Sequence, residues 1–265
     1  MAEHSLSPMK RTIVGVQFMF VAFGSTVLVP ILCNLDPAVA LLAAGLGTLL
    51  FHLVTGGKVP IYLGSSFAFI APIIKATELY GLSGMFCGLV SVGIVYMLMG
   101  LLVKTFGIGF IKKLFPPIVI GPVIILIGLS LASTGVNMAK ANWILALVSL
   151  AVAVAASIWG KGIVKLIPVV FGAVAGYIVS LLFFRESMDF SPVAQASWFA
   201  IPKLSHMSFS WQAILFMAPV AIAPIIEHVG DMYAISSISG EDFIKDPGLH
   251  RTLLGDGLSC CLAAF

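Results

Sequence analysis

The chain has 265 residues, of which 60% are hydrophobic and 9% are charged, and its formal net charge at pH 7 is +3. With so few charged residues it cannot build a water-covered surface, which excludes a soluble globular protein and indicates a polytopic membrane protein. The small excess of positive charge gives no support to nucleic-acid binding.

Segments long and apolar enough to cross a bilayer as helices recur along the whole chain. They are predicted at residues 12–33, 37–55, 82–105, 118–133, 142–159, 163–184 and 211–238, with a shorter element at 60–79 and a further apolar run from Thr252. That last run has about 14 residues before Phe265, too few to cross at about 1.5 Å of rise per residue. The sequence therefore predicts an N-terminal fragment of a longer membrane protein.

Lysine and arginine are distributed unevenly between the two sides of this predicted topology. If the N-terminus lies inside, ten of the 14 basic residues fall in inner loops and four fall outside, namely Lys75, Lys140, Arg185 and Lys203. Because inner loops are enriched in these residues, the pattern predicts a multi-pass protein of the plasma (inner) membrane with a cytoplasmic N-terminus.

The first predicted span carries small and polar residues at helical spacing: Gln17, Gly24, Ser25 and Thr26. In a bilayer such a stripe is typical of helix packing, but the same face can bind a ligand, so Ser25 is a candidate for both roles. The four cysteines lie in or beside apolar stretches without CxxC or Cys/His spacing. Neither a disulfide, a metal site nor a cofactor is therefore predicted.

Residues 59–72 form a stretch that does not fit a helix. Tyr62, Gly64, two serines and the rings of Phe67 and Phe69 lie between prolines, which favours an extended strand over 62–70. Extended backbone at membrane depth is tolerated only where protein buries it or a watery cavity lines it. Broken elements of this kind form binding sites in secondary transporters, although an ordinary re-entrant loop would give the same pattern.

Residues 223–231 place ionisable side chains near the end of the apolar run that begins at Trp211. Glu227 and Asp231 are four residues apart and share one face of a helix, whereas His228 points elsewhere. A carboxyl at the centre of a spanning helix costs about 2.5–3.5 kcal/mol on insertion scales, so the pair predicts a polar cavity, an ion path or a substrate site. We expect no other carboxylate at this depth; a helix that ends at the interface near Glu227 is the alternative.

Three stretches, in this order, resemble the nucleobase–ascorbate transporters, and most closely their uracil permease branch. They are Gln17 followed by AFGSTVLVP at 22–30, YLGSSFAFIAP at 62–72, and IEHVGD at 226–231 with DPGLHR at 246–251. The resemblance implies an all-α polytopic fold, the first half of a transporter with two inverted repeats of seven spans, with a short strand in the broken third span. Residues 1–105 and 211–265 would then belong to a core domain, and residues 106–210 to a gate domain.

The resemblance also implies roles for individual residues. Glu227 matches the substrate-binding glutamate of the eighth span, Phe67 matches a strand position whose backbone contacts the base, and Asp231 matches a position that is histidine in some uracil permeases. Phe18 departs from the pattern, because many members have histidine there. The tenth-span strand with the second substrate-binding glutamate would lie beyond Phe265, so this chain would hold about half a binding site.

The chemistry of a carboxyl fits a pyrimidine base. Uracil offers N–H donors beside carbonyl acceptors, and a protonated carboxyl presents one donor and one acceptor side by side. Since burial favours the neutral carboxyl, protonation of Glu227 and binding of the base would favour one another, which is a route to proton symport. We assign Asp231 to the same coupling, and the rings of Phe67 and Phe69 either stack on the base or pack.

The main prediction is therefore a proton-coupled uracil symporter, not an enzyme. A purine permease for xanthine or urate is the first alternative, since Asp231 does not exclude it. An anion carrier of related inverted-repeat fold is the second, although Glu227 argues against it. An intramembrane hydrolase is disfavoured, because no nucleophile motif accompanies Glu227 and His228.

Expected partners are a small nucleobase, protons and the lipid bilayer, with a homodimer left open and no nucleic acid.

Overall fold

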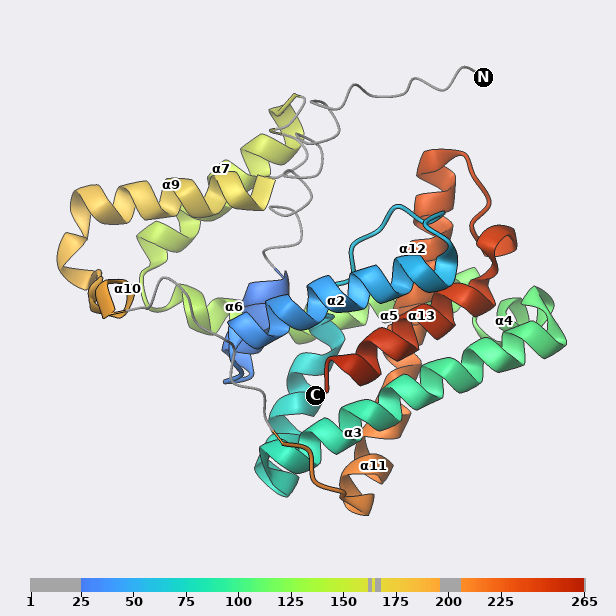
Figure 1. Ribbon diagram of the computed structural model, residues 1–265. Helices are drawn as coiled ribbons and strands as arrows, with labels where there is room; N and C mark the ends of the chain where they lie inside the picture. The colour runs from blue at the N-terminus through green and yellow to red at the C-terminus, as the bar shows by residue number, and fades with distance from the viewer. Residues whose placement is uncertain (1–24, 162–163, 165–167, 196–205, 265) are drawn as a thin grey trace. The chain divides into compact units, whose positions relative to one another are not determined.

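The computed structural model describes residues 25–161, 164, 168–195 and 206–264 (Figure 1). They belong to two compact units: unit 1 comprises residues 1–24 and 132–201, and unit 2 comprises residues 25–131 and 202–265. The first part of the first predicted span, with Gln17 and Phe18, lies outside the described residues. Residues 25–32, at its end, are helical as predicted.

Within the described ranges, four helices are long and apolar enough to cross a membrane. They are Pro37–Thr55, Phe67–Phe106, Ile118–Ala139 and Trp211–Ser237, and Trp143–Trp159 and Pro168–Phe183 are shorter apolar helices. Every predicted span that falls on described residues thus has a helical counterpart. The chain is an α-helical, multi-pass membrane protein.

Helix α2 (Pro37–Thr55) matches the second predicted span residue for residue. The Asp36 side chain caps its N-terminus by accepting a hydrogen bond from the Ala38 N–H at 2.8 Å, and Pro37 occupies the first turn, where a backbone N–H is not required. Gly56 ends the helix with φ +67°, a left-handed conformation that glycine adopts without strain. Local sequence is therefore sufficient to set both ends of α2.

The chain after α2 is irregular and does not form the predicted strand. Residues 60–66 are neither helix nor strand, the 3-10 turn η1 (Phe67–Phe69) follows, and α3 (Ile70–Phe106) begins directly after it. A strand needs a hydrogen-bonded neighbouring strand, and none is present among the described residues. The expected break in the helical pattern is therefore present at 60–66, but the strand predicted over 62–70 is not.

Helix α3 consists of two helices that meet at Gly81. This residue has φ +71° and ψ 170°, which are not helical values and which favour glycine. Residues 70–80 correspond to the short element predicted before the next span, and residues 82–106 correspond to the predicted span at 82–105. The short half-helix therefore begins directly at the irregular segment.

The remaining helices of unit 2 lie on both sides of unit 1 in the sequence. Before it come α4 (Ile108–Leu114) and α5 (Pro117–Ser130). After it come α11 (Trp211–Met217), the 3-10 turn η3 (Ala218–Ala221), α12 (Ile222–Ser239), the turn η4 (Ile244–Gly248) and α13 (Leu249–Leu262). The predicted span over 211–238 is thus interrupted by η3 before the helix that carries Glu227.

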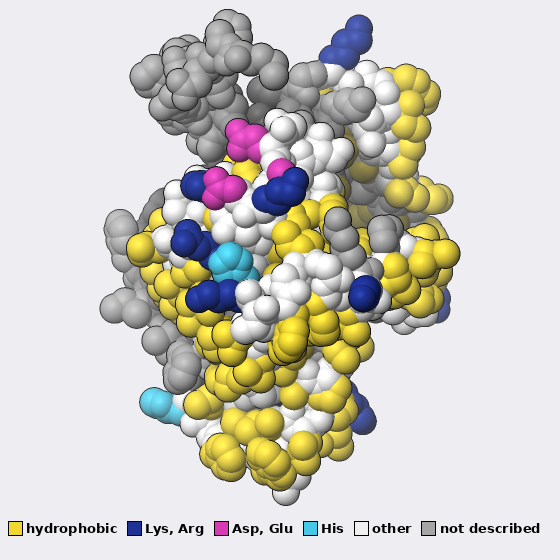
Figure 2. Space-filling model, turned by 90° about the vertical axis from the view of Figure 1, so that its right-hand side faces the viewer, with side chains coloured by type: hydrophobic (Ala, Val, Ile, Leu, Met, Phe, Trp, Pro, Cys, Tyr) yellow, Lys and Arg dark blue, Asp and Glu magenta, His cyan; other side chains and the backbone are white. Residues whose placement is uncertain are grey.

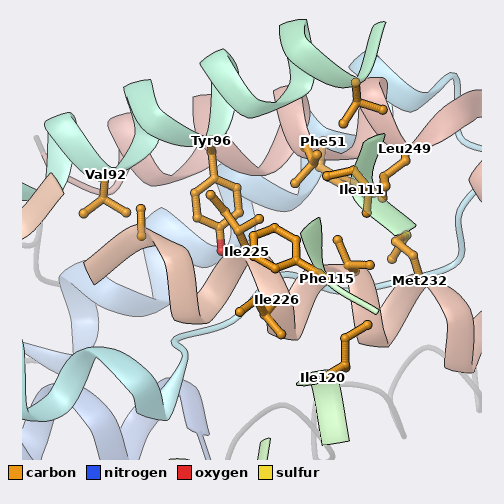
Figure 3. Packing of buried hydrophobic residues seen from close by; sticks show 14 of the residues in the cluster. Phe51, Val92, Tyr96, Ile111, Phe115, Ile120, Ile225, Ile226, Met232 and Leu249 are labelled. Carbon is orange, nitrogen blue, oxygen red and sulfur yellow. The ribbon is translucent and has the colours of Figure 1, made fainter. Parts of the chain in front are cut away.

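The core of unit 2 forms where α13 packs along α3 and α2 (Figure 1). Glycines allow this close approach: a Cβ added to Gly93 on α3 would come within 2.5 Å of the Gly257 carbonyl oxygen on α13. Figure 3 shows Tyr96 of α3 extending toward Ile225 and Ile226 of α12, all three of them buried. Helices α3, α12 and α13 are therefore held together by one apolar cluster.

In the view of Figure 2, Lys and Arg side chains lie around a histidine, with acidic side chains near them. In unit 2, Lys58 after α2 pairs with Asp246 before α13, with a distance of 2.5 Å from Nζ to Oδ1. Burial and the nearby charges of Arg251 and Lys104 lower the pKa of His250. Loops predicted to lie on the inner side of the membrane thus meet at one end of unit 2.

Unit 1 contains a tightly packed pair of apolar helices. Its elements are α6 (Ala132–Ala139), α7 (Trp143–Trp159), α9 (Pro168–Phe183), η2 (Arg185–Ser187) and α10 (Ser191–Gln195). Helix α7 packs on α9 through small residues, since a Cβ on Gly172 would lie 2.6 Å from the Ser149 carbonyl oxygen. This close packing is typical of helices that associate in a bilayer.

Candidate functional site

A cavity of about 800 Å³ lies inside unit 2, between the irregular segment and helices α2, α3, α12 and α13. This volume is within the range of about 300–1,000 Å³ that is usual for small-molecule sites. Most of its wall is apolar, and four ionisable side chains of α12 and α13 also line it, namely Glu227, His228, Asp231 and Asp256. The cavity thus joins the two stretches that the sequence singled out.

Glu227 binds directly to the irregular segment. The Ser66 hydroxyl donates a hydrogen bond to Glu227 Oε2 at 2.6 Å, across 161 residues of sequence. Ser66 is also the N-cap of η1, where its Oγ accepts a hydrogen bond from the Ala68 N–H at 3.2 Å. The same hydroxyl therefore caps η1, the turn that precedes α3, and binds one oxygen of the Glu227 carboxyl at the cavity.

Thr48 of α2 provides hydrogen bonds for the irregular backbone. The Leu63 N–H donates to Thr48 Oγ1 at 3.0 Å, and the hydroxyl of Thr48 donates to the Ala44 carbonyl oxygen at 2.7 Å. Unpaired backbone groups at membrane depth cost several kcal/mol each, so such partners are required where a helix is interrupted. Gly64 allows the close fit on the other side, because a Cβ there would lie 2.8 Å from Thr26 Oγ1.

The other predicted site residues are distributed unevenly around the cavity. Ser25, Phe69 and Asp231 line it together with Glu227, and Asp231 follows Glu227 by one turn of α12 as expected. Phe67, the first residue of η1, is not among the residues that line the cavity; its side chain packs against the buried apolar cluster. A role for Phe67 through its backbone stays a prediction.

His228 and Asp256 are site residues that sequence reasoning missed. His228 lines the cavity instead of pointing away from it, and its Nδ1 lies 2.9 Å from Asp256 Oδ2. The expectation that no further carboxylate lies at this depth is wrong, because Asp256 of α13 reaches the same wall. The sequence does contain a signal for Asp256, since it is the lone acidic residue of the apolar run from Thr252 and acidic residues are costly in a bilayer.

The electrostatic character of this site favours some ligands over others. Three carboxyl groups of α12 and α13, those of Glu227, Asp231 and Asp256, line one cavity together with Asp36 before α2, and no lysine or arginine is among its described lining residues. Such a wall repels anions, whereas a neutral molecule with N–H donors can be bound by carboxyl oxygens. The geometry therefore suits a small, neutral, polar ligand or a cation better than an anion.

Comparison with known proteins gives a consistent result. The profile of a family described as "Permease family" matches residues 9–265. The chain is 47% identical to the "Probable uracil permease" of Haemophilus influenzae, over 98% of this chain and 64% of that protein. It is 41% identical to the "Uracil permease" of Bacillus subtilis, over 95% of this chain and 62% of that protein. It is also 35% identical to a "Putative pyrimidine permease" of Escherichia coli, over 96% of this chain and 60% of that protein.

These names describe transport proteins, in agreement with the prediction that the chain is not an enzyme. The chain spans somewhat less than two thirds of the length of these relatives.

Proposed function

The chain belongs to the permease family of nucleobase–ascorbate transporters, and from this premise we propose that it forms the substrate-binding part of a proton-coupled uracil symporter. The observation that carries the proposal is the bond between Ser66 and Glu227. It brings a carboxyl of α12 to the irregular segment at the wall of a cavity large enough for a base.

Uracil fits the donors and acceptors that this wall presents. One Glu227 oxygen accepts from Ser66, and the other is free to contact the base in the described part of the site. A protonated carboxyl matches an N–H donor next to a carbonyl acceptor, which is the edge of a pyrimidine. The Phe69 ring on the same wall offers a surface on which a flat base can stack.

Proton coupling is proposed on the same geometry. Glu227 and Asp231 lie one turn apart at the cavity, so two like charges would oppose each other there and uptake of a proton would relieve the repulsion. If the base binds the protonated carboxyl, the affinity for protons and the affinity for the base rise together. The proton gradient across the membrane can then drive accumulation of the base.

A purine is the first alternative substrate. The relatives named above support a pyrimidine, since their names specify uracil or pyrimidine. An anion carrier is disfavoured by the three carboxyl groups of the cavity wall.

We also propose the arrangement that the family resemblance implies. The chain would provide the first of two inverted seven-span repeats and the start of the second, in the plasma membrane, with its N-terminus in the cytoplasm. Residues 1–105 and 211–265 would form core-domain parts and residues 106–210 a gate-domain part. The contact between Lys58 and Asp246 agrees with the topology, because it joins two loops that the distribution of basic residues places on the same side of the membrane.

The test is the substitution Glu227→Gln in a carrier that contains this chain and has the full length of its relatives, called here the full-length carrier. Glutamine keeps the hydrogen-bonding shape but cannot exchange a proton, so we expect uracil uptake to fall at least about tenfold and to lose its dependence on pH. Uptake of radiolabelled uracil is measured at several pH values, with competition by unlabelled uracil, xanthine and urate.

Glu78→Gln is the matched control, because Glu78 is an exposed partner of Lys75 on α3. It should leave uptake unchanged. Unaltered, pH-dependent uptake in the Glu227→Gln variant would refute the proposed role of this carboxyl, and stronger competition by xanthine than by uracil would favour the purine alternative.

A further inference from the structure

His228 joins α12 to α13 through both nitrogens of its ring. Nδ1 lies 2.9 Å from Asp256 Oδ2, and Nε2 lies 3.0 Å from Thr252 Oγ1. The imidazole side chain is 5% exposed and the Asp256 carboxyl is 26% exposed, so the contact lies at the buried edge of the cavity. The edge of the Tyr96 ring packs against the imidazole, with centroids 6.2 Å apart and planes at 88°.

The number of protons in this contact follows from the direction of the Thr252 hydrogen bond. The Thr252 hydroxyl has one hydrogen, and when it donates this to the Leu249 carbonyl oxygen, 3.0 Å away, it accepts a hydrogen bond from His228 Nε2. Nε2 therefore carries a proton. The 2.9 Å contact between Nδ1 and Asp256 then requires a second proton, located either on the ring or on the carboxyl. In both cases histidine and aspartate together have no net charge.

The groups around the imidazole show why this neutrality matters. On its own helix α12 it is flanked by Glu227 and Asp231, which face the same cavity. From α13 it meets Asp256, with Cys260 one turn further along that helix, and from α3 it meets Tyr96. Among the described residues that line the cavity no lysine or arginine balances the carboxyl groups, which include Asp36 at the N-terminus of α2. An unpaired Asp256 would therefore add a further negative charge to the wall.

We propose that His228 is a positioning residue that forms a pair without net charge with Asp256 and ties α12 to α13. In this arrangement Asp256 adds no negative charge to that of the other carboxyl groups that line the cavity, Glu227, Asp231 and Asp36. The inference rests on the proposed function, because it assigns His228 a part in preparing the uracil site. It also predicts the thermal unfolding of the protein without ligand, so the inference and the proposed function can be refuted separately.

The variant His228→Asn isolates the effect of the proton. Asparagine can place an N–H near the position of Nδ1, but it cannot hold the second proton, so its pair with Asp256 keeps a negative charge. At neutral pH this charge should weaken uracil binding about tenfold or more, since a hydrogen bond to a charged group is worth about 1.5–3 kcal/mol.

The double variant His228→Asn with Asp256→Asn removes the charge together with its partner. Two amides can form a neutral hydrogen-bonded pair, so binding at neutral pH should return to within about threefold of the unsubstituted protein. Binding is measured at neutral pH on the purified full-length carrier with radiolabelled uracil, and thermal unfolding without ligand is followed at the same pH. His52→Asn, on α2 outside the cavity lining, is the control and should change neither quantity.

The outcomes are distinguishable. An affinity loss that is not repaired by adding Asp256→Asn would show a purely structural histidine and overturn the inference, as would unchanged binding in His228→Asn. If the unsubstituted carrier binds no uracil, the proposed function fails. The inference is then decided by unfolding of the empty protein: His228→Asn should lower the unfolding temperature, and the double variant should restore most of it. An equal loss in the single and the double variant would overturn it.

Discussion

The α7–α9 pair of unit 1 and the α3–α12–α13 cluster of unit 2 solve the problem of helix packing in a membrane in different ways. Helices α7 and α9 contain no charged residue, and they meet through small residues such as Ser149, Gly172 and Gly176. Helices α12 and α13 carry three carboxyl groups and a histidine to a common cavity. The first pair requires only complementary shape, whereas the second cluster requires partners for its polar groups.

The comparison shows where an acidic side chain is tolerated in this chain. Glu227 has the Ser66 hydroxyl and Asp256 has His228, so these two carboxyls of the cavity wall each obtain a specific partner. The outer faces of α7 and α9 offer large apolar side chains such as Leu150, which is 60% exposed. Between these two sets of helices, the carboxyl groups therefore lie in the cluster of unit 2, where a ligand can use them.

The largest expected effect comes from placing a carboxyl on the apolar pair. Leu150→Asp would add an acid near the centre of α7, with no donor comparable to Ser66, and should cost about 2.5–3.5 kcal/mol of membrane insertion. The inserted fraction of α7 is measured by glycosylation mapping during translation into microsomes, with Leu150→Ala as the control. Insertion of the aspartate variant as efficient as that of the alanine variant would contradict the contrast between the two units.

A smaller effect is expected from removing the donor of Glu227. Ser66→Ala removes a hydrogen bond to a carboxyl and the cap of η1, so the affinity for uracil should fall by about 1.5–3 kcal/mol, or roughly 10- to 100-fold. Ser65→Ala is the matched control, since no side-chain hydrogen bond of Ser65 is found in the described part of unit 2. Equal affinities of the two variants in the binding assay would show that Ser66 does not position the carboxyl.

The smallest effect distinguishes the packing of the two units. In Gly93→Ala the new methyl group would overlap Cys261 Sγ and lie 2.5 Å from the Gly257 carbonyl oxygen, so backbone must move, at a cost of about 1–3 kcal/mol. In Gly176→Ala it would overlap only the Ser149 hydroxyl, which can rotate away, so the loss should be smaller.

The control for these packing variants is Gly45→Ala on α2, where no atom lies within 4 Å of the added methyl group. It should be neutral or stabilising by up to about 1 kcal/mol. Thermal unfolding in detergent measures all three variants. A larger loss for Gly176→Ala than for Gly93→Ala would reverse this ranking of the two interfaces.

Local sequence predicted the helices better than it predicted the site. The span at 37–55 was exact because Asp36, Pro37 and Gly56 mark its ends, and the break near residues 60–66 followed from its serines, glycine and prolines. The strand was not found, because strand pairing depends on a second segment. Glu227 and Asp231 were expected on one face and both line the cavity.

The pairing of His228 with Asp256 could not be read from the sequence, because it depends on how α12 and α13 cross. Periodicity along one helix gives the direction of a side chain but not its partner on another helix. Asp256 itself was detectable as an acid in an apolar run. The bond between Ser66 and Glu227 similarly required the fold, since 161 residues separate them.

Neighbouring residues on α12 are attached to different parts of the protein. Side chains that follow each other on a helix diverge by about 100°, so Glu227 reaches the start of α3 while His228 reaches α13. If α12 turned about its own axis, both attachments would be strained together. A ligand that displaces the Glu227 carboxyl would therefore also strain the contact between His228 and α13, even if the ligand does not touch α13.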